Sequence, residues 1–302
     1  MEHCAANCLL RSSRRGGAVS ISVVIPAFNE EVSIGRCLDN LVEQIDDIAE
    51  IVVVNNNSAD KTADIVAAHQ ATVQKIRLLD ESRQGIVPAR NRGLTSAASD
   101  VIARIDADTI VQPGWAAAID SFFSSAGPEF GAAVGPFTQY DMPLQGVHRA
   151  LMRIATTSRK GESDEIKQSP GVYGANMAIR REVWEEIESL THDEPGIWED
   201  LDISIALRAV GRKIAVIEGM RVQVSGRRML TSRKLYWQFT RGVPRTWELH
   251  GDRSRARASW INVWIARTMY LVFWVPTRTY DPMARKHSIR RLFADREDRP
   301  IA

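Results

Sequence analysis

Apolar segments followed by a polar loop and a helical pattern constrain the fold of this chain most. Residues 20–26 and 50–54 are β-branched runs typical of buried strands, and helical patterns begin at residues 29 and 62. Successive strand–loop–helix units favour parallel strands, because each helix returns the chain to the starting edge of the sheet. The pattern continues with a strand at 73–79, a helix at 88–98 and a strand at 101–105. We therefore expect an α/β fold with a mostly parallel central sheet flanked by helices.

The strand at 101–105 stops at two carboxylates, Asp106 and Asp108. Residues i and i+2 of an extended chain share a face, so both side chains should point the same way from the end of the sheet. Oxygen ligands of this kind suit Mg²⁺ or Mn²⁺ carrying a diphosphate. A solvated turn is the alternative, because Asp is common where strands end.

Three loops should meet beside these carboxylates. In parallel sheets ligands bind in the crevice outside the carboxyl ends of the strands. The loops at 26–31, 55–60 and 106–108 all follow such ends. We therefore expect them to form one crevice.

Charge is unevenly distributed along the 302 residues, although the overall net charge is only +2. Residues 219–302 contain 18 Lys/Arg against 6 Asp/Glu, whereas residues 1–218 contain 21 against 31. A basic tail on an acidic body suggests an anionic partner for the tail, such as a phosphate-bearing substrate or a lipid surface. Solvated helix faces are the alternative, and we expect no nucleic-acid partner.

The cysteines and the first residues indicate a cytoplasmic protein. Cys4, Cys8 and Cys37 form no metal-binding pattern and are expected to be reduced. Residues 1–18 contain a short apolar patch before three arginines, which reverses the charge order of a signal peptide. We interpret this segment as a disordered N-terminus without export.

Several motifs occur in an order and spacing that resemble a known family. Residues 23–31, 54–62, 89–93 and 105–108, continued by 174–181 and 198–202, resemble the inverting glycosyltransferases of family 2, which have the GT-A fold. The resemblance covers about residues 20–245. It implies a catalytic domain at 19–245, with a nucleotide-binding half at about 19–110 and an acceptor-binding half at about 111–245. Residues 246–302 would then be a basic, aromatic, helical extension.

The resemblance also implies roles for individual residues. Asp200 matches the general base, and Asp106 and Asp108 match the metal-binding carboxylates. The expected donor-binding residues are Pro26, Ala27, Asn29, Glu30, Asn56, Arg90, Asp106, Arg227, Arg228 and Arg241. The expected acceptor-binding residues are Gly174, Ala175, Asn176, Trp198 and Glu199.

Two positions depart from the family pattern. Residues 55–58 read Asn-Asn-Asn-Ser where members usually have an Asp-Asp-Gly-Ser type of loop, and an amide lacks the carboxylate's charge. The donor nucleotide, UDP- or GDP-linked, is therefore left open. Gln238 and Arg241 match a motif of processive members, but Gly242 replaces the tryptophan of that motif, which favours transfer of a single sugar.

Asp200 lies where a helical pattern begins, so capping of that helix is an alternative to catalysis. A positioned carboxylate can accept the proton of an attacking hydroxyl, which is otherwise a poor nucleophile. Arg227, Arg228 and Arg241 could hold diphosphate oxygens bidentately, with exposed surface arginines as the alternative.

Two further regions have open interpretations. Residues 147–156 could form an amphipathic helix and 160–165 a mobile loop, together a lid or an ordinary surface loop. Residues 260–275 are apolar and aromatic, but a helix of this length spans roughly 24 Å, short of a roughly 30 Å hydrocarbon core. We expect an interfacial or subunit-contacting helix, with the basic stretch 285–291 near anionic headgroups. Packing on the catalytic domain is the alternative, and a homodimer remains open.

The sequence thus predicts an enzyme that transfers one sugar from a nucleotide donor to an acceptor hydroxyl in cell-envelope polysaccharide, glycolipid or glycoconjugate synthesis. A sugar-1-phosphate nucleotidyltransferase is an alternative, but it would carry a glycine-rich phosphate loop after the first strand, which residues 26–30 do not resemble. The second alternative is a non-catalytic protein that binds sugar nucleotides. Contact with the inner face of the membrane would be peripheral.

Overall fold

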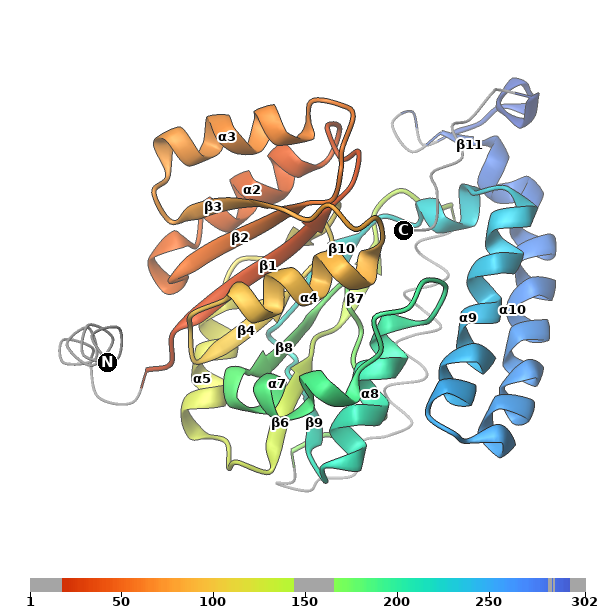
Figure 1. Ribbon diagram of the computed structural model, residues 1–302. Coiled ribbons are helices and arrows are strands. Elements are labelled where there is room, and N and C mark those ends of the chain that lie inside the picture. The colour runs from red at the N-terminus through yellow and green to blue at the C-terminus, as the bar shows by residue number, and fades with distance from the viewer. Residues whose placement is uncertain (1–17, 144–165, 282–283, 285, 294–302) are drawn as a thin grey trace.

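The computed structural model describes residues 18–143, 166–281, 284 and 286–293 (Figure 1). Cys4, Cys8, the N-terminus predicted to be disordered, the helix predicted at 147–156 and the loop predicted at 160–165 lie outside the described residues. Cys37 is a free, buried thiol.

The central sheet has seven strands in the order β3-β2-β1-β4-β8-β6-β9. They are β1 (Ile21–Ala27), β2 (Glu50–Asn55), β3 (Ile76–Asp80), β4 (Val101–Arg104), β6 (Phe130–Val134), β8 (Met177–Arg180) and β9 (Lys213–Val216). Strands β3, β2, β1 and β4 pair in parallel, as do β6 and β9, whereas β8 is antiparallel to both of its neighbours. The predicted mostly parallel sheet is confirmed.

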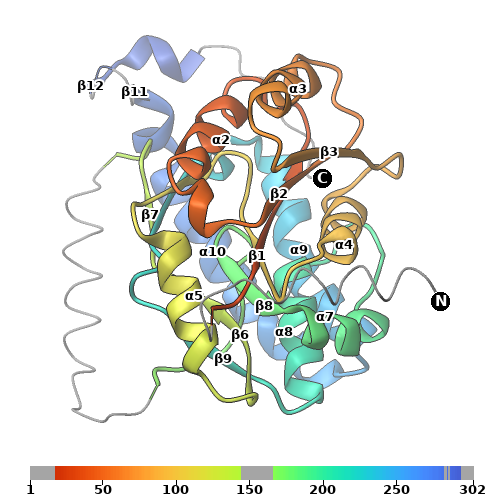
Figure 2. The same cartoon turned by 90° about the vertical axis from the view of Figure 1, so that its left-hand side faces the viewer.

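Helices cover both faces of this sheet (Figure 2). One face carries α2 (Ile34–Val42), α3 (Thr62–Thr72) and α5 (Trp115–Ser125), and the other carries α4 (Ile86–Ser96), α7 (Arg181–Ile187) and α8 (Glu199–Ala209). Successive residues of β1 alternate between the two cores, because strand side chains point to opposite faces in turn. Val23 and Ile25 pack with the first set of helices, and Val24 packs with the second.

Some element boundaries differ from the prediction for local reasons. The first helix starts at Ile34 rather than residue 29, because the amides of Ser33 and Ile34 both donate to the Glu30 carbonyl, at 3.0 and 2.9 Å. The third strand starts at Ile76 rather than residue 73. Val73 still belongs to the end of α3, since its amide donates to the His69 carbonyl at 2.8 Å.

A second, three-stranded sheet lies beside the carboxyl ends of the central strands. Its order is β5 (Ile110–Val111), β10 (Val222–Val224) and β7 (Phe137–Gln139). Strand β10 pairs antiparallel with β5 and parallel with β7. Because β5 follows Asp108 almost directly, this pairing brings the residues after β10 to the carboxylates.

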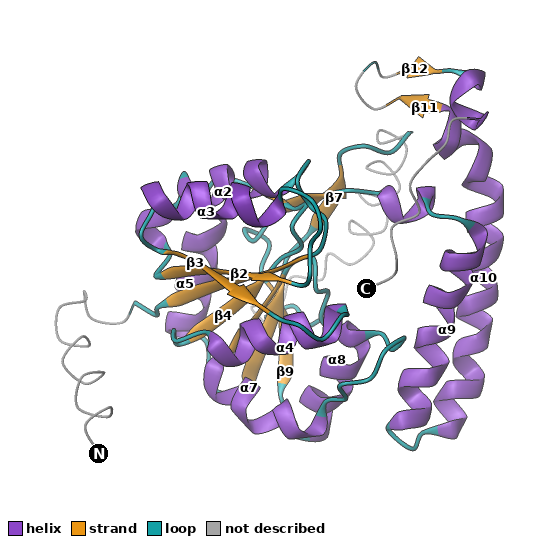
Figure 3. Ribbon diagram, turned by 45° about the horizontal axis from the view of Figure 1, so that its top comes forward, coloured by secondary structure: helices purple, strands orange, loops and turns teal. Residues whose placement is uncertain are grey.

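The C-terminal part is built around two long helices that lie side by side (Figure 3). Helix α9 (Arg233–Leu249) and helix α10 (Arg253–Thr279) are joined by a short turn. Residue 245, after which the sequence predicted the extension, lies inside α9. None of the helices in the described residues is long and apolar enough to cross a membrane. Smaller elements complete this description: β11 (Tyr280–Asp281), β12 (Lys286–His287), and 3-10 helices at Ile45–Asp47, Glu188–Leu190, Arg227–Leu230 and Ile289–Phe293.

Helix α10 uses one face to pack and leaves the other exposed. Val263, Arg267 and Tyr270 are buried, and the Tyr236 and Tyr270 rings stack at 4.3 Å between centroids. Ile261, Trp264 and Val272 are 67%, 60% and 61% exposed. The predicted apolar segment therefore packs on α9 and also presents an apolar face to the outside.

Candidate active site

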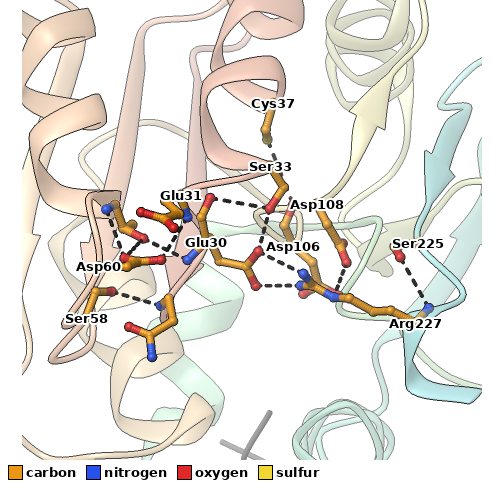
Figure 4. Close-up of polar contacts among 12 residues, drawn as sticks. Glu30, Glu31, Ser33, Cys37, Ser58, Asp60, Asp106, Asp108, Ser225 and Arg227 are labelled. Atoms are coloured by element: carbon orange, nitrogen blue, oxygen red, sulfur yellow. Dashed lines mark hydrogen bonds and ion pairs between the residues drawn. The ribbon is translucent and has the colours of Figure 1, made fainter. Parts of the chain in front are cut away.

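The loops after β1 and β2 are held together by hydrogen bonds (Figure 4). The Asn29 amide donates to Ser58 Oγ at 3.1 Å, and the Ala59 amide donates to Asn29 Oδ1 at 2.8 Å. Asn29 has a φ of 52°, a left-handed conformation that Asn tolerates better than most residues. Glu30 is fixed next to it, since its amide donates to Thr62 Oγ1 at 2.7 Å.

Glu30 and Asp108 hold the Arg227 guanidinium between them (Figure 4). Arg227 Nη2 lies 2.5 Å from Glu30 Oε1, and Arg227 Nε lies 2.7 Å from Asp108 Oδ2. Burial raises the pKa of Asp108 to about 7, with further upward contributions from Asp106 and Glu30 and an opposing one from Arg227. The cluster therefore holds more negative charge than one arginine neutralises.

Arg104, the last residue of β4, joins this cluster to the second acidic motif. Its side chain is 2% exposed and lies 2.9 Å (Nη2) from Asp106 Oδ1 and 3.1 Å (Nη1) from Asp200 Oδ1. Glu199 Oε1 is 3.5 Å from Nη2. Sequence reasoning missed this residue. Its signal was a lone arginine within the apolar run at 101–105, which must find a charged partner when the strand is buried.

Asp200 lies in the first turn of α8, but its carboxylate does not serve mainly as a helix cap. Trp198 is the N-cap residue, and it makes no side-chain capping bond. The Asp200 side chain is 32% exposed, contacts Arg104 and accepts a hydrogen bond from the Gly174 backbone. Burial and then the Glu199 charge raise the pKa of Asp200 to about 7, against the opposing effect of Arg104. Such a carboxylate can take up a proton near neutral pH.

Gly174 is required for the approach of these two side chains. A Cβ at this position would lie 1.2 Å from Arg104 Nη1 and 2.5 Å from Asp200 Oδ1. Glycine is the residue that allows such a close approach. Among the predicted acceptor-binding residues, Gly174 and Glu199 thus lie at the acidic centre.

Asn56 and Asn176 were predicted to bind substrates, but both are buried and engaged elsewhere. Asn56 Nδ2 donates to the Glu81 and Arg83 carbonyls at 2.9 and 2.7 Å, so it shapes the loop before α4. Asn176 Oδ1 accepts from Trp115 Nε1 at 2.9 Å, and its Nδ2 donates to the Met220 carbonyl at 2.7 Å. These hydrogen bonds stabilise the fold, because a buried side-chain amide without a partner would destabilise the core.

Arg90, predicted to bind the donor, is also fully buried. Its Nη1 donates to the Glu199 carbonyl at 3.0 Å, and its Nη2 donates to Asn91 Oδ1 at 2.7 Å. It therefore supports the start of α8. Ala27 is 2% exposed, and its carbonyl accepts the Asn56 amide at 2.8 Å. Pro26 is likewise buried and Ala175 is partly buried, so this surface offers little of their side chains to a ligand.

The three predicted diphosphate arginines lie in different places. Arg227 is at the carboxylates, whereas the Arg228 guanidinium stacks 4.1 Å from the Phe239 ring centroid. Arg241 lines a separate hollow on α9. Only Arg227 of these three thus contacts the carboxylates in the described residues.

Trp198 connects α8 to α9. Its Nε1 donates to the Phe239 carbonyl at 2.9 Å, and the two rings lie 4.8 Å apart between centroids. A Cβ at Gly242 would lie 2.6 Å from Trp198 Cδ1, so Trp198 fills the space beside Gly242.

A cluster of His192, Asp202 and His250 supports the same region and was also missed. Asp202 is fully buried, and its Oδ1 lies 2.8 Å from both His192 Nδ1 and His250 Nε2. Within the described residues these three could also hold a metal ion, since their ligand atoms lie within 4.8 Å of one another. Hydrogen bonds account for the same distances. No sequence signal joins residues so far apart in the chain.

The carboxylates at the end of β4 have the chemistry of divalent-cation ligands, although in the described residues only His192, Asp202 and His250 have ligand atoms grouped within 4.8 Å of one another. Glu30, Asp106 and Asp108 provide carboxylate oxygens, the ligands that Mg²⁺ and Mn²⁺ prefer. The raised pKa of Asp108 shows that added positive charge would stabilise its ionised form.

Comparison with known proteins identifies similar sequences. Residues 22–188 match the model described as "Glycosyl transferase family 2". Amylovoran biosynthesis glycosyltransferase AmsB of Erwinia amylovora is 40% identical over 93 residues, 30% of this chain and 31% of that protein. Glycosyltransferase AglE of Haloferax volcanii is 25% identical over 170 residues, 55% of this chain and 54% of that protein. The matched part thus spans about a third to about half of these curated relatives.

Solved structures share the fold at low sequence identity. The mannosyltransferase PcManGT of Pyrobaculum calidifontis, in complex with GDP-Man and Mn²⁺, gives a TM-score of 0.59 at 19% identity over 90% of this chain and 81% of that chain. Glucosyl-3-phosphoglycerate synthase of Mycobacterium tuberculosis, in complex with Mn²⁺, UDP and phosphoglyceric acid, gives 0.51 at 18% identity over 76% and 78%.

Proposed function

Because the chain belongs to glycosyl transferase family 2 and is therefore a glycosyltransferase with a GT-A type of fold, we propose that it transfers one sugar from a UDP- or GDP-linked donor to an acceptor hydroxyl with inversion. The observation that carries this proposal is the contact of Arg104 with both Asp106 and Asp200. The buried Arg104 side chain thus contacts both a donor-side carboxylate, Asp106, and the candidate base, Asp200.

The donor half is the cluster of Glu30, Asp106, Asp108 and Arg227. The three carboxylates would hold Mg²⁺ or Mn²⁺, which supplies positive charge to a departing diphosphate. Arg227 adds a planar, permanently charged guanidinium beside them, suited to diphosphate oxygens. Asn29 and its hydrogen-bonded loop lie directly before Glu30.

The acceptor half is the start of α8. The acceptor oxygen attacks the anomeric carbon, the bond from that carbon to the diphosphate breaks, and the hydroxyl proton passes to the Asp200 carboxylate. Attack opposite the leaving group inverts the carbon. A pKa of about 7 leaves enough ionised Asp200 to accept a proton at neutral pH. Gly242 beside Trp198 supports transfer of a single sugar, because the space beside it is filled by the Trp198 ring.

A nucleotide-sugar hydrolysis screen tests this function. Purified chain should release UDP or GDP from one nucleotide sugar when Mn²⁺ or Mg²⁺ is present, and chelator should stop the release. Asp108→Asn should reduce release strongly, whereas Asp141→Asn, a nearby carboxylate that accepts from Ser225 Oγ, should retain most of it. Release from no nucleotide sugar, or equal release with chelator, contradicts the proposal.

We also propose that the enzyme works at the cytoplasmic face of a membrane, with α10 as its contact surface. The exposed face of α10 carries Ile261, Trp264 and Val272, while the whole helix has five arginines and no Asp or Glu. Lys286 and Arg290 are exposed beyond its end. A second copy would bring these like charges together, whereas anionic headgroups neutralise them. This location agrees with a role in cell-envelope glycan or glycolipid synthesis.

Vesicle cosedimentation tests this contact. The chain should sediment with phosphatidylglycerol-containing vesicles, less so as salt rises, and Ile261→Ser with Val272→Ser should reduce sedimentation several-fold. Leu190→Ser, which removes an exposed apolar side chain elsewhere, is the matched control. Dimerisation in free solution that the double substitution abolishes would instead identify a second copy as the occupant.

A further inference from the structure

Three segments that are distant in the sequence meet at the Asp202 carboxylate. Asp202 lies in α8, which packs between α7 and α9 (Figure 1). His192 follows the 3-10 helix at Glu188–Leu190, and His250 is the C-cap residue of α9. Both imidazoles place a nitrogen 2.8 Å from the same oxygen, Asp202 Oδ1. The cluster therefore ties the loop before α8 and the end of α9 to α8 itself.

The carboxylate and the two rings hold a defined arrangement. The other carboxylate oxygen, Asp202 Oδ2, accepts the His192 backbone amide at 2.8 Å. The His192 and His250 rings are nearly perpendicular, at 82°, with their centroids 4.6 Å apart. The three ligand atoms lie within 4.8 Å of one another. Two imidazoles and one carboxylate are a ligand set that suits Zn²⁺ and related transition-metal ions.

Hydrogen bonds explain the distances in this cluster, but they do not balance its charge. The Asp202 side chain is fully buried, and in the described residues its ion-pair partners within 4.0 Å are the two imidazoles rather than a Lys or an Arg. Neutral imidazoles donate hydrogen bonds without cancelling the charge of a carboxylate. A buried carboxylate destabilises a fold unless a cation accompanies it.

Two buried arginines near the start of α8 do not supply this cation. Burial lowers the pKa of Arg90, and the charges of Glu199 and Asp202 oppose that effect. Arg104 is already paired with other carboxylates. The carboxylates that act on these two arginines are Asp106, Glu199, Asp200 and Asp202. Four carboxylates against two arginines leave this part of the fold negative, which favours binding of a cation.

The cluster is accessible to an ion from solution and is separate from the reacting groups. The His192 and His250 side chains are 28% and 13% exposed. Residues two apart on a helix point about 200° away from each other, so Asp202 faces away from Asp200. An ion at Asp202 would thus hold the start of α8 in place without touching a substrate.

We propose that His192, Asp202 and His250 bind Zn²⁺, which fixes α8 to the loop before it and to the end of α9. Two imidazole nitrogens favour this ion over Mg²⁺, which prefers oxygen ligands. Three protein ligands leave a further position of the ion to water. The site is distinct from the carboxylates at the end of β4, and it does not depend on the proposed sugar transfer.

Calorimetric titration of the full chain with Zn²⁺ tests this site. Every protein compared carries Cys4→Ser, Cys8→Ser and Asp108→Asn, because thiols and the carboxylates at the end of β4 could also bind zinc. Adding His192→Gln with His250→Gln should weaken zinc binding about a hundredfold or more, since two of the three ligands are lost. Glutamine keeps a side-chain N–H that can donate to Asp202, so these variants separate metal binding from hydrogen bonding.

His69→Gln is the matched control. His69 Nε2 also contacts a carboxylate, Asp39 Oδ1 at 3.1 Å, but in the described residues it shares that carboxylate with no second imidazole. This substitution should leave zinc affinity unchanged. His192→Gln and His250→Gln are also measured singly, and melting curves without zinc identify the variants that fold.

Two further readouts report on the same ion. Zinc at about a hundred times its dissociation constant should raise the melting temperature by about 5 °C in the parent, and the histidine variants should lose this increase. Co²⁺ in place of zinc should give visible absorption that the same variants lose. Absence of zinc binding in the parent, equal binding in the folded histidine variants, or an equal loss in His69→Gln overturns the inference.

Discussion

Arg104→Gln should move the pH dependence of transfer upward. Arg104 Nη1 lies 3.1 Å from Asp200 Oδ1, and an opposite charge at such a distance lowers a carboxyl pKa by about one to three units. Burial and Glu199 already raise the pKa of Asp200 to about 7. Without the Arg104 charge, that pKa should rise to roughly 8 to 10.

The size of the effect at neutral pH follows from the ionised fraction. A general base must be deprotonated, so transfer is present above its pKa and is lost as pH falls through it. At pH 7 the ionised fraction of Asp200 would fall from about one half to between about a tenth and a thousandth. Transfer in Arg104→Gln should therefore fall about fivefold to five-hundredfold at pH 7 and recover about tenfold per pH unit above it.

The assay is the acceptor-dependent rate at saturating donor, measured from about pH 5 to about pH 10. Arg104→Lys keeps the charge and should retain an inflection closer to that of the parent. Arg180→Gln is the control for loss of a partly buried arginine, because Arg180 donates to the Phe123 and Ala126 carbonyls and contacts no site carboxylate. Circular dichroism at each pH excludes unfolding. A uniform loss of rate in Arg104→Gln, with the inflection unchanged, would refute the electrostatic reasoning.

Three further outcomes are expected. Asp200→Asn should lower transfer by about a hundredfold or more while donor affinity changes only a few-fold, and near-parental transfer would reduce Asp200 to a structural role. Gly174→Ala should remove transfer but leave Mn²⁺-dependent nucleotide binding, because its Cβ would displace the Arg104 and Asp200 side chains; normal transfer would contradict this geometry. Mn²⁺ should raise the melting temperature more at about pH 8 than at about pH 5, because Asp108, with its pKa raised to about 7, binds the cation only when ionised. Asp108→Asn should abolish this difference.

Local sequence patterns were sufficient for the sheet and for the edge of the sheet at which the carboxylates gather. The runs that form β1, β2 and β4 can be recognised from their β-branched composition. The edge at which the parallel strands end follows from their connection by helices. Asp106, Asp108 and Glu30 were predictable because each follows such an end directly. The antiparallel β8 was not, since its pairing with β4 and β6 depends on residues about 50 to 80 positions away.

Side-chain contacts between distant segments were the part that the sequence did not reveal. Substrate contacts of Asn56, Arg90 and Asn176 stay predictions, and what the sequence did not reveal is that these side chains are buried and hydrogen-bonded to distant segments. A motif records which residue types recur at a site, but it does not separate those that touch a ligand from those that support them. Arg104 and Asp202 are further examples, since burial of a charge is visible only once the strands and helices are packed.

The distribution of charge around Arg104 and Arg227 is difficult to explain by folding alone. Glu30, Asp106, Asp108, Glu199 and Asp200 share two arginines, Arg104 and Arg227. The pKa values of Asp108 and Asp200 are raised to about 7, so the folded chain binds protons there that the unfolded chain releases at lower pH. The free energy of unfolding therefore falls as pH rises from the unfolded pKa toward 7. Above pH 7 the folded state carries the full penalty of the two ionised carboxylates. A divalent cation beside Asp108 and a proton taken up by Asp200 would each relieve that penalty, and these are the two events that the proposed sugar transfer requires. The excess negative charge of the folded chain thus lies at the two carboxylates that the proposed reaction would neutralise.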